Sequence, residues 1–144
     1  MSDLILVNDD LVQFNQAFGL AMVVVRPGRL SGSGPGTLNG KSICVDGDQN
    51  QVSVPGCVYM TAVYSIPGTG TLKIDSLSAN QIATKTRSGA KPALLKGVSF
   101  IAKFEVQSPA QQPPPGPGSP IPDSTLQYPG SGSFITANQT IRGT

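Results

Sequence analysis

The sequence predicts an all-β fold of short strands with little helix, and two observations carry this prediction. First, several stretches alternate apolar and polar residues with a period of two, which is typical of strands with one buried face. Second, the 17 Gly and 13 Pro residues are concentrated in turns and in one tract. We expect residues 1–144 to form a single domain, because a chain of this length buries roughly two-thirds of its unfolded surface.

The first third of the chain holds two candidate elements and one turn. Residues 10–22 give a weak amphipathic pattern for a short helix, which Gly19 interrupts. The apolar, β-branched run at 22–25 is expected to form a strand that is covered on both faces. Asn39 and Gly40 stand between two β-prone stretches and predict a two-residue hairpin turn.

The middle of the chain holds the two clearest strands. Residues 58–66 alternate, and the apolar face that we expect to be buried carries Val58, Met60, Ala62, Tyr64 and Ile66. Residues 100–107 alternate in the same way, with an apolar face made of Phe100, Ala102, Phe104 and Val106. Between these strands, residues 77–86 allow one or two helical turns at most.

A proline-rich stretch follows at residues 108–123. Pro113, Pro114 and Pro115 have no backbone donor, so the run favours an extended polyproline II conformation. We expect a stiff strap that lies over the domain surface and returns the C-terminal segment to the body, with a disordered linker as the alternative. The Pro-x-x-Pro spacing also suits a ligand for an aromatic groove, but no Arg or Lys flanks it.

The composition excludes several function classes. The formal net charge is +2 and only 12% of residues are charged, which gives no indication of nucleic-acid binding. The sequence has no His, so the commonest general base and the commonest zinc ligand are both missing. Nucleophile-elbow and phosphate-loop motifs are absent as well. We therefore expect that the protein is not an enzyme.

The N-terminal sequence bears on localisation. It carries acidic residues and does not resemble the basic start of a signal peptide. The longest apolar run, at 20–25, is far shorter than the ~20 residues that span a bilayer. We expect the chain to be made in the cytoplasm without a signal peptide.

Cys44 and Cys57 are too few for a disulfide framework or for a zinc site of four thiolates. By default both are small core residues, while a bridge between them or an incomplete soft-metal site stays open. Asp46, Asp48 and Asn50 resemble the start of a calcium loop, but the places that require Gly and Glu hold other residues. A polar turn between two strands is the favoured interpretation.

A short glycine cassette, Gly-[Ser/Thr]-Gly, occurs three times in the chain. Its first and last residues are Gly32 and Gly34, Gly68 and Gly70, and Gly130 and Gly132. Each copy is followed further on by an acidic or amide residue and Gln, at 48–49, 80–81 and 138–139. Because glycine permits sharp turns and close backbone approach, the copies predict three related corners.

Together these features resemble the PAAR-like spike-tip proteins of contractile injection systems. In that family the phrase NGKP…GD recurs on short strands, and Asn39-Gly40-Lys41 with Gly47-Asp48 matches it. The resemblance covers about residues 20–110 and includes the stretches GTGTLKI and LLKGVSFIAKFEVQSPAQ.

The resemblance implies a small conical fold with an approximate internal three-fold arrangement. It implies a structural tip that caps and sharpens a homotrimeric β-helical spike of the VgrG type, aids membrane puncture and carries effector cargo. The apparatus would be a type VI secretion system, an extracellular injection particle or a phage-tail-like baseplate, which delivers the tip outside the cell or into a target cell. Eight residues are then candidates for corners or for the spike interface: Gly32, Gly34, Asn39, Gly40, Gly68, Gly70, Gly130 and Gly132.

One departure from the family concerns its metal site. Tips of this kind commonly hold zinc near the apex with three His and one Cys, whereas this chain has no His. We favour no metal or other cofactor, with Cys44 or Cys57 as the remnant of such a site, while a Cys pair or an iron or zinc site of Cys and carboxylates stays open. The expected partners are the spike, effector cargo and, transiently, the target membrane, and not nucleic acid. The alternative interpretation is a small β-sandwich module that binds a ligand and has no spike partner.

Overall fold

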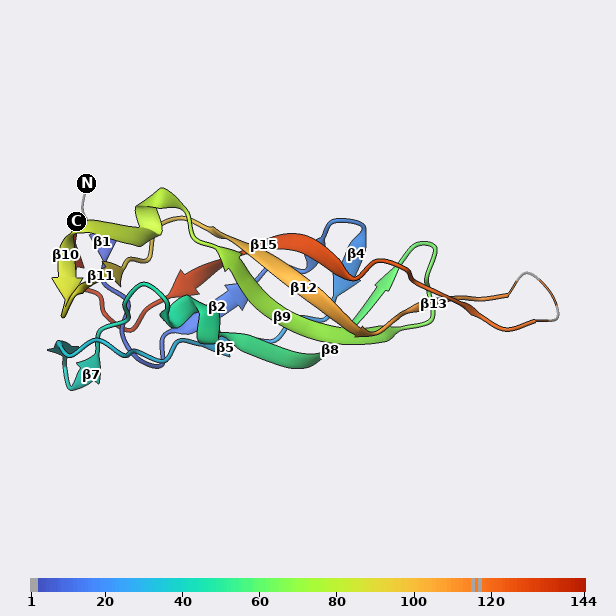
Figure 1. Ribbon diagram of the computed structural model, residues 1–144, viewed down its shortest axis with the longest axis horizontal. Helices are drawn as coiled ribbons and strands as arrows, with labels where there is room; N and C mark the ends of the chain where they lie inside the picture. The colour runs from blue at the N-terminus through green and yellow to red at the C-terminus, as the bar shows by residue number, and fades with distance from the viewer. Residues whose placement is uncertain (1–2, 115, 117) are drawn as a thin grey trace.

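Figure 1 shows a computed structural model of the chain, which describes residues 3–114, 116 and 118–144. The molecule is elongated. Its broad end, which we call the base, carries strands β1 (Asp3–Leu4) and β16 (Arg142–Gly143), and its opposite, distal end narrows into an arm. Two 3-10 turns, η1 (Asp48–Gln51) and η2 (Ala79–Gln81), account for the helix among the described elements. The all-β prediction with little helix is confirmed.

Eight strands form one antiparallel sheet that curls around the long axis. In spatial order they are β3 (Ala17–Phe18), β4 (Ala21–Val23), β8 (Ser53–Thr61), β9 (Gly68–Ser76), β12 (Phe100–Ser108), β15 (Gln127–Ile135), β2 (Leu11–Phe14) and β5 (Gly28–Arg29). Strands β8, β9, β12 and β15 have nine residues each and are longer than the short strands that the sequence predicts. The main sheet is therefore single, unlike the two stacked sheets of the sandwich alternative.

The inside of the curled sheet is filled by aromatic side chains. Phe100 packs against Phe14 and Phe134, with ring centroids 5.7 and 5.0 Å away. Tyr59 packs on Phe104 at 5.1 Å. All five side chains are buried. Because large rings supply much of the apolar surface that a core buries, this cluster decides which face of each strand points inward.

The core confirms one strand prediction and corrects another. Phe100 and Phe104 on β12 point inward as expected. On β8 the buried face is the opposite of the predicted one, since Tyr59 is fully buried while Met60 is 39% exposed. Hydropathy alone is misleading at this strand, because the Tyr59 hydroxyl has a buried hydrogen-bond partner, Asp123, that satisfies its polar end.

Two predictions for the N-terminal third are wrong. Residues 10–22 contribute strands β2, β3 and β4 instead of a helix. The run at 22–25 is not covered on both faces, because Met22 and Val24 are 60% and 64% exposed. The single-layered sheet explains this difference: its inner face meets the core, and its outer face is open to solvent.

Small two-stranded ladders build the base. Strands β6 (Thr37–Leu38) and β7 (Lys41–Ser42) are joined by Asn39 and Gly40, whose φ angles are 52° and 80°. These positive angles are what a tight hairpin of this kind requires, so the predicted hairpin is confirmed.

Two further ladders match this hairpin. Strand β10 (Ile82–Ser88) pairs with β11 (Lys91–Leu94), and β16 pairs with β1. The three registers correspond, with equivalent pairs Leu38–Lys41, Ser88–Lys91 and Gly143–Asp3. The third ladder thus joins the two ends of the chain where the other two have a turn.

Directly after the ladders, three short segments meet in a closed triangle. Leu6 donates its backbone N–H to the carbonyl of Leu94 (2.9 Å), Leu94 donates to Cys44 (2.9 Å), and Cys44 donates to Leu6 (3.0 Å). Each segment gives one bond and receives one in the same rotational sense. The three side chains are 0% exposed, so they fill the centre of the base.

A second set of bonds surrounds this triangle and runs in the opposite cyclic order. The donor N–H and acceptor C=O groups are Asn8 to Ser42 (2.8 Å), Asp46 to Pro92 (2.9 Å) and Lys96 to Leu4 (2.9 Å). A rotation that carries each of the three segments onto the next also carries each of the six bonds onto an equivalent bond. The base therefore has an approximate three-fold axis within a single chain, as the resemblance implies.

The glycine cassettes do not provide this symmetry. Two lie on strands of the sheet and one lies in the connection from β5 to β6: Gly68 and Gly70 on β9, Gly130 and Gly132 on β15, and Gly32 and Gly34 in the connection. The prediction of three related corners is therefore wrong. A Cβ atom on Gly130 would lie 2.4 Å from the Phe18 ring, so this glycine leaves room for a core side chain in the middle of a strand.

The proline-rich stretch is not a strap over the surface. Strands β13 (Gln111–Gln112) and β14 (Ile121–Pro122) pair with each other and form the arm that projects from the distal end (Figure 1). The ends of the stretch are held side by side, because Asp123 donates its N–H to the Ala110 carbonyl (2.8 Å). The described residues between them, Pro113 and Pro114 included, therefore extend outward and return, while Pro115 lies outside the described residues.

Candidate functional site

Two buried carboxylates hold the turns that follow the central triangle. Asp10 accepts hydrogen bonds from the backbone N–H groups of Val7 (2.7 Å) and Ala137 (3.0 Å). Asp48 accepts from the N–H of Val45 (2.9 Å) and from Ser33, whose hydroxyl lies 2.6 Å away. Both oxygens of Asp48 are engaged in this way, so the stretch at 46–51 is a structured polar turn, as favoured over a calcium loop.

Amide side chains hold the remaining parts of the base. Gln81 is fully buried and donates to the Lys96 carbonyl (3.2 Å). Asn138 donates to the carbonyls of Ile5 (3.0 Å) and Ile141 (2.7 Å). The sequence has three pairs in which an acidic or amide residue precedes Gln, at 48–49, 80–81 and 138–139. Each pair contributes one buried polar residue to the base, namely Asp48, Gln81 and Asn138. These residues fix backbone that would otherwise have unpaired polar groups.

Cys44 lies at the centre of the triangle and Cys57 lies on β8, and both are buried and free. Burial, together with the nearby carboxylates of Asp48 and Asp10, raises the pKa of the Cys44 thiol to about 12. The thiol is therefore protonated at neutral pH and packs as a small apolar group. Within residues 3–114, 116 and 118–144, no three His, Cys, Asp or Glu side chains are grouped so that they could hold a metal ion.

The outer surface of the base is basic. Lys41 and Lys91 are exposed at matching positions of their ladders. Further exposed cations in this region are Lys85, Arg87, Lys96 and Arg142. The neighbouring acids are fewer: Asp9 is exposed, and Asp3 and Asp46 are half-buried. Such a surface favours contact with a negatively charged partner.

Two grooves at the base occupy related positions. The larger one, of about 460 Å³, has Asp3 and Leu95 in its walls. The smaller one, of about 70 Å³, has Lys41 and Val7 at the corresponding places. Two equivalent places around the ladders therefore carry a groove, although the two grooves differ in volume.

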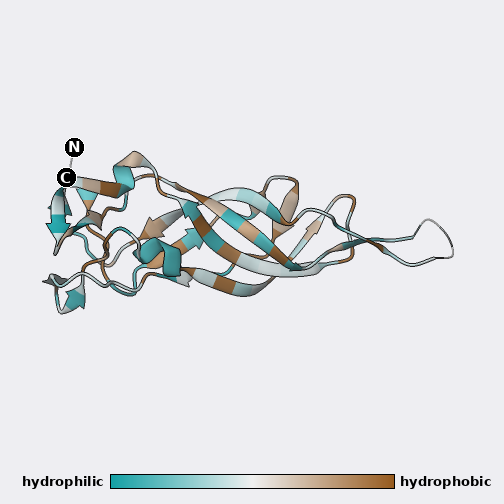
Figure 2. Cartoon of the chain, viewed as in Figure 1, coloured by the Kyte–Doolittle hydropathy of each residue, from teal (hydrophilic) through white to brown (hydrophobic). Residues whose placement is uncertain are grey.

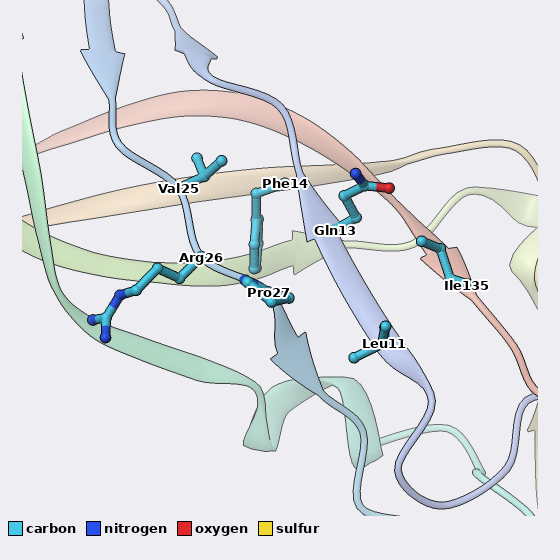
Figure 3. A pocket seen from close by; sticks show the side chains of 7 residues that line it. All are labelled: Leu11, Gln13, Phe14, Val25, Arg26, Pro27 and Ile135. Atoms are coloured by element: carbon cyan, nitrogen blue, oxygen red, sulfur yellow. The ribbon is translucent and has the colours of Figure 1, made fainter.

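A third pocket lies on the side wall of the molecule (Figure 3). It has a volume of about 320 Å³ and is lined by Leu11, Gln13, Phe14, Val25, Arg26, Pro27 and Ile135. Arg26 points away from the Phe14 ring, and its guanidinium donates to the Pro55 carbonyl. The lining offers neither an acid–base pair nor a nucleophile, so the pocket provides no chemistry of its own.

At the root of the arm, a buried carboxylate joins two tyrosines. The hydroxyls of Tyr59 (3.0 Å) and Tyr128 donate to Asp123, and Thr125 donates its N–H to the same carboxylate (2.9 Å). Burial acts to raise the pKa of Asp123, but the hydrogen bonds from Tyr128, Thr125 and Tyr59 outweigh it and lower that pKa below its ordinary value. The cluster therefore anchors the arm with an ionised, fully hydrogen-bonded group.

The eight candidate residues from the sequence separate into two groups. Asn39, Gly40, Gly32 and Gly34 lie at the base, and the first two form an exposed turn. Gly68, Gly70, Gly130 and Gly132 lie inside the sheet against core groups, at positions with no outer corner. The interface role of the first four stays a prediction.

The residues that make the triangle were missed at the sequence level, although a signal for them exists. The stretches 5–10 and 43–48 read ILVNDD and ICVDGD, and 93–98 reads ALLKGV at the equivalent place. The fifth residue of each has a positive φ: Asp9 at 71°, Gly47 at 109° and Gly97 at 56°. A search for short apolar triplets followed by such a turn would have found the repeat.

No helix within the described residues has the length and apolar character needed to cross a membrane. Comparison with curated proteins gives no match. A family model described as "Contractile injection system spike tip protein" matches residues 1–144. That description names a structural component, which is not a known class of enzyme. The chain belongs to the family of spike tip proteins of contractile injection systems, in agreement with the resemblance that its sequence shows.

Proposed function

We propose that this chain caps the blunt end of a homotrimeric β-helical spike and seats on it through the base. The observation that carries the proposal is the pair of cyclic hydrogen-bond sets around Leu6, Cys44 and Leu94. They give one polypeptide three nearly equivalent sides at one end of the molecule. A trimer presents three identical surfaces around its axis, and a cap with matching sides meets all three in one orientation.

The physical reason for such a cap lies in the strand edges of the spike. The last strands of a β-helical trimer have unpaired backbone groups, and exposed edges of this kind lead to aggregation unless they are covered. The short ladders lie around the axis at the base, where they can cover these edges. They comprise the Asn39–Gly40 hairpin and its two counterparts.

The charge of the base adds a property of the partner. Lys41, Lys91 and the four other exposed cations favour a spike whose rim carries acidic side chains. A spike of the VgrG type in a type VI secretion system, an extracellular injection particle or a phage-tail-like baseplate is the partner that fits this role. The tip is made in the bacterial cytoplasm, assembled into the particle and delivered with it.

In this role the chain acts mechanically and is not an enzyme. The narrow distal end leads, aids puncture of the target membrane and touches it transiently. Effector cargo is carried on the spike complex, and the arm that contains β13 and β14 is the part of the tip most accessible to it. Neither nucleic acid nor a metal cofactor has a part in this function.

The test is co-expression with the spike protein from the same injection system, followed by native mass spectrometry. We expect one tip chain per three spike chains. A photo-cross-linker attached at Asn39→Cys should then capture the spike, whereas one at Gly116→Cys in the arm should not. Absence of any complex, or cross-links from the arm alone, would overturn the proposal.

A further inference from the structure

Charged residues are nearly absent from the parts of the chain that reach the distal end. The polypeptide leaves the base and returns three times, over residues 11–25, 49–72 and 106–135. These three excursions contain one charged residue, Asp123. That carboxylate is 5% exposed and is covered by the two tyrosines at the root of the arm. Figure 2 shows strongly hydrophilic residues on the short ladders of the base, including β7 and β10.

A small group of charges marks where the uncharged part begins. On β9 and β12, Glu105 forms ion pairs with Lys73 (2.8 Å) and Lys103 (3.7 Å). Along β12 toward the distal end, Glu105 is the last charged residue before the arm, and Lys73 is the first on β9 in the returning direction. Arg26 occupies the corresponding place after β4. The boundary between the charged and the uncharged parts therefore runs around the molecule about halfway along its long axis.

One face of the uncharged part is apolar. Met22 on β4 pairs with Met60 on β8, and Val24 donates its N–H to the Val58 carbonyl, so these four outward side chains are neighbours. Their exposed fractions are 60%, 39%, 64% and 37% in that order. We call Met22, Val24, Val58 and Met60 the apolar strip. Leu20 and Val63, in the adjoining turns, are also exposed.

We infer that the uncharged distal half contacts the hydrocarbon of a lipid bilayer, and that the apolar strip is the part of its surface that lies against the acyl chains. This inference rests on the proposed role in membrane puncture and says which surface carries it out. A docking site for another protein would be one patch with a charged or polar rim. Here charge is missing on every side of the distal half, which fits a surrounding medium that penalises charge everywhere.

The internal structure supports contact with lipid. Charged side chains inside a bilayer carry a large free-energy penalty, and the single carboxylate of the distal half is already enclosed by hydrogen-bond donors. Strands β8, β9, β12 and β15 pair with one another, so their backbone polar groups are largely satisfied within the sheet. The outer side chains of these four strands can therefore meet lipid while the backbone groups between the strands stay paired.

The first experiment uses tryptophan as a reporter, because the sequence has none. Met22→Trp places the reporter on the apolar strip, and Lys91→Trp places it at the base. Each full-length variant is mixed with phosphatidylcholine vesicles, with and without brominated acyl chains. We expect the emission of Met22→Trp to move to shorter wavelength and to be quenched by bromine, while Lys91→Trp keeps its emission.

The second experiment introduces charge. Val24→Lys is expected to lower the fraction of protein that floats with the vesicles by at least about tenfold, whereas Thr84→Lys, an exposed site at the base, leaves it unchanged. Circular dichroism and thermal unfolding check that the variants are folded. Val63→Lys, in an exposed turn, serves as a second variant if Val24→Lys does not fold.

The outcomes separate this inference from the proposed function. Unchanged Met22→Trp emission, or quenching of Lys91→Trp instead, overturns the lipid contact even where the complex with the spike forms normally. Sedimentation of the protein without vesicles tests for contact between copies of the chain. If the protein dimerises and Val24→Lys abolishes the dimer, the apolar strip is a contact between copies and the inference is wrong. Loss of the spike complex with intact vesicle binding overturns only the proposed function.

Discussion

Asp10 and Asp48 occupy the same place in two of the three turns around the central triangle. The carboxylate of Asp10 accepts the backbone N–H of Val7 at 2.7 Å, and that of Asp48 accepts the N–H of Val45 at 2.9 Å. Each aspartate also donates its own N–H to the carbonyl of the same valine. Val98 stands at the third position and is 75% exposed, so the symmetry is carried by the backbone and by only two of the three side chains.

Removal of the Asp48 carboxylate should weaken the whole base. Asp48→Ala leaves the buried N–H of Val45 without its partner and also releases Ser33, which bonds to both oxygens. We expect the free energy of unfolding to fall by about 1–3 kcal/mol, measured by urea denaturation. Asp75→Ala, at an exposed site, is the control and should be near neutral. Equal effects of the two substitutions would contradict the role given to Asp48.

The thiol of Cys44 should be unreactive in the folded protein. Its pKa of about 12 leaves almost no thiolate at neutral pH, and its side chain is fully buried. We expect Ellman's reagent to detect no thiol in the native protein at pH 8 and both thiols in guanidinium chloride. Rapid native labelling that mass spectrometry assigns to Cys44 would show that the triangle opens readily.

Gly130 should tolerate no side chain while Phe18 is present. A Cβ atom at this position would lie 2.4 Å from the Phe18 ring, so Gly130→Ala forces the core to shift. We expect a loss of about 1–3 kcal/mol in stability. In a Phe18→Leu background the same substitution should cost clearly less, because the clashing ring atoms are gone.

The matched control for these substitutions at Gly130 is Gly116→Ala in the arm, where no atom lies within 4 Å of the added Cβ. It should leave the unfolding midpoint unchanged. If Gly130→Ala proves as harmless as Gly116→Ala, the explanation of this cassette as space for an aromatic ring fails.

These contacts show how much of the fold the sequence could predict. The alternation in β12 and the Asn39–Gly40 hairpin depend on neighbouring residues and were predictable. The inward face of β8 was not, because the burial of Tyr59 depends on Asp123, 64 residues further along the chain. The length of the strands likewise depends on pairing between distant segments.

The candidate site shows the same limit. The position of the exposed Asn39–Gly40 turn at the base follows from local turn chemistry. The triangle does not, since Leu6, Cys44 and Leu94 are brought together only by backbone bonds among segments far apart in the chain. The glycine cassettes were the more visible repeat, but their shared role is limited to close packing, which need not place them symmetrically.

Neutralising the base should weaken binding to the spike. Lys41→Gln together with Lys91→Gln removes two exposed cations at equivalent positions, and we expect a several-fold higher dissociation constant at low salt. The difference from the wild type should shrink as ionic strength rises, since exposed charges are screened. Lys103→Gln, on the side wall beside Glu105, is the matched control. A salt-independent affinity in the wild type would contradict an acidic rim on the partner.

The root of the arm should make stability depend on pH through Asp123. Its pKa is lower in the folded chain than the ordinary 3.8, because Tyr128, Thr125 and Tyr59 donate hydrogen bonds to the ionised form. The ionised carboxylate therefore stabilises the fold above about pH 4, and this contribution is lost as the pH falls from 3.8 toward the folded value. We expect the thermal midpoint of the wild type to fall more steeply below pH 4 than that of Asp123→Asn, which is less stable at pH 7. Parallel curves for the two proteins would show that the carboxylate is not the group that holds the arm.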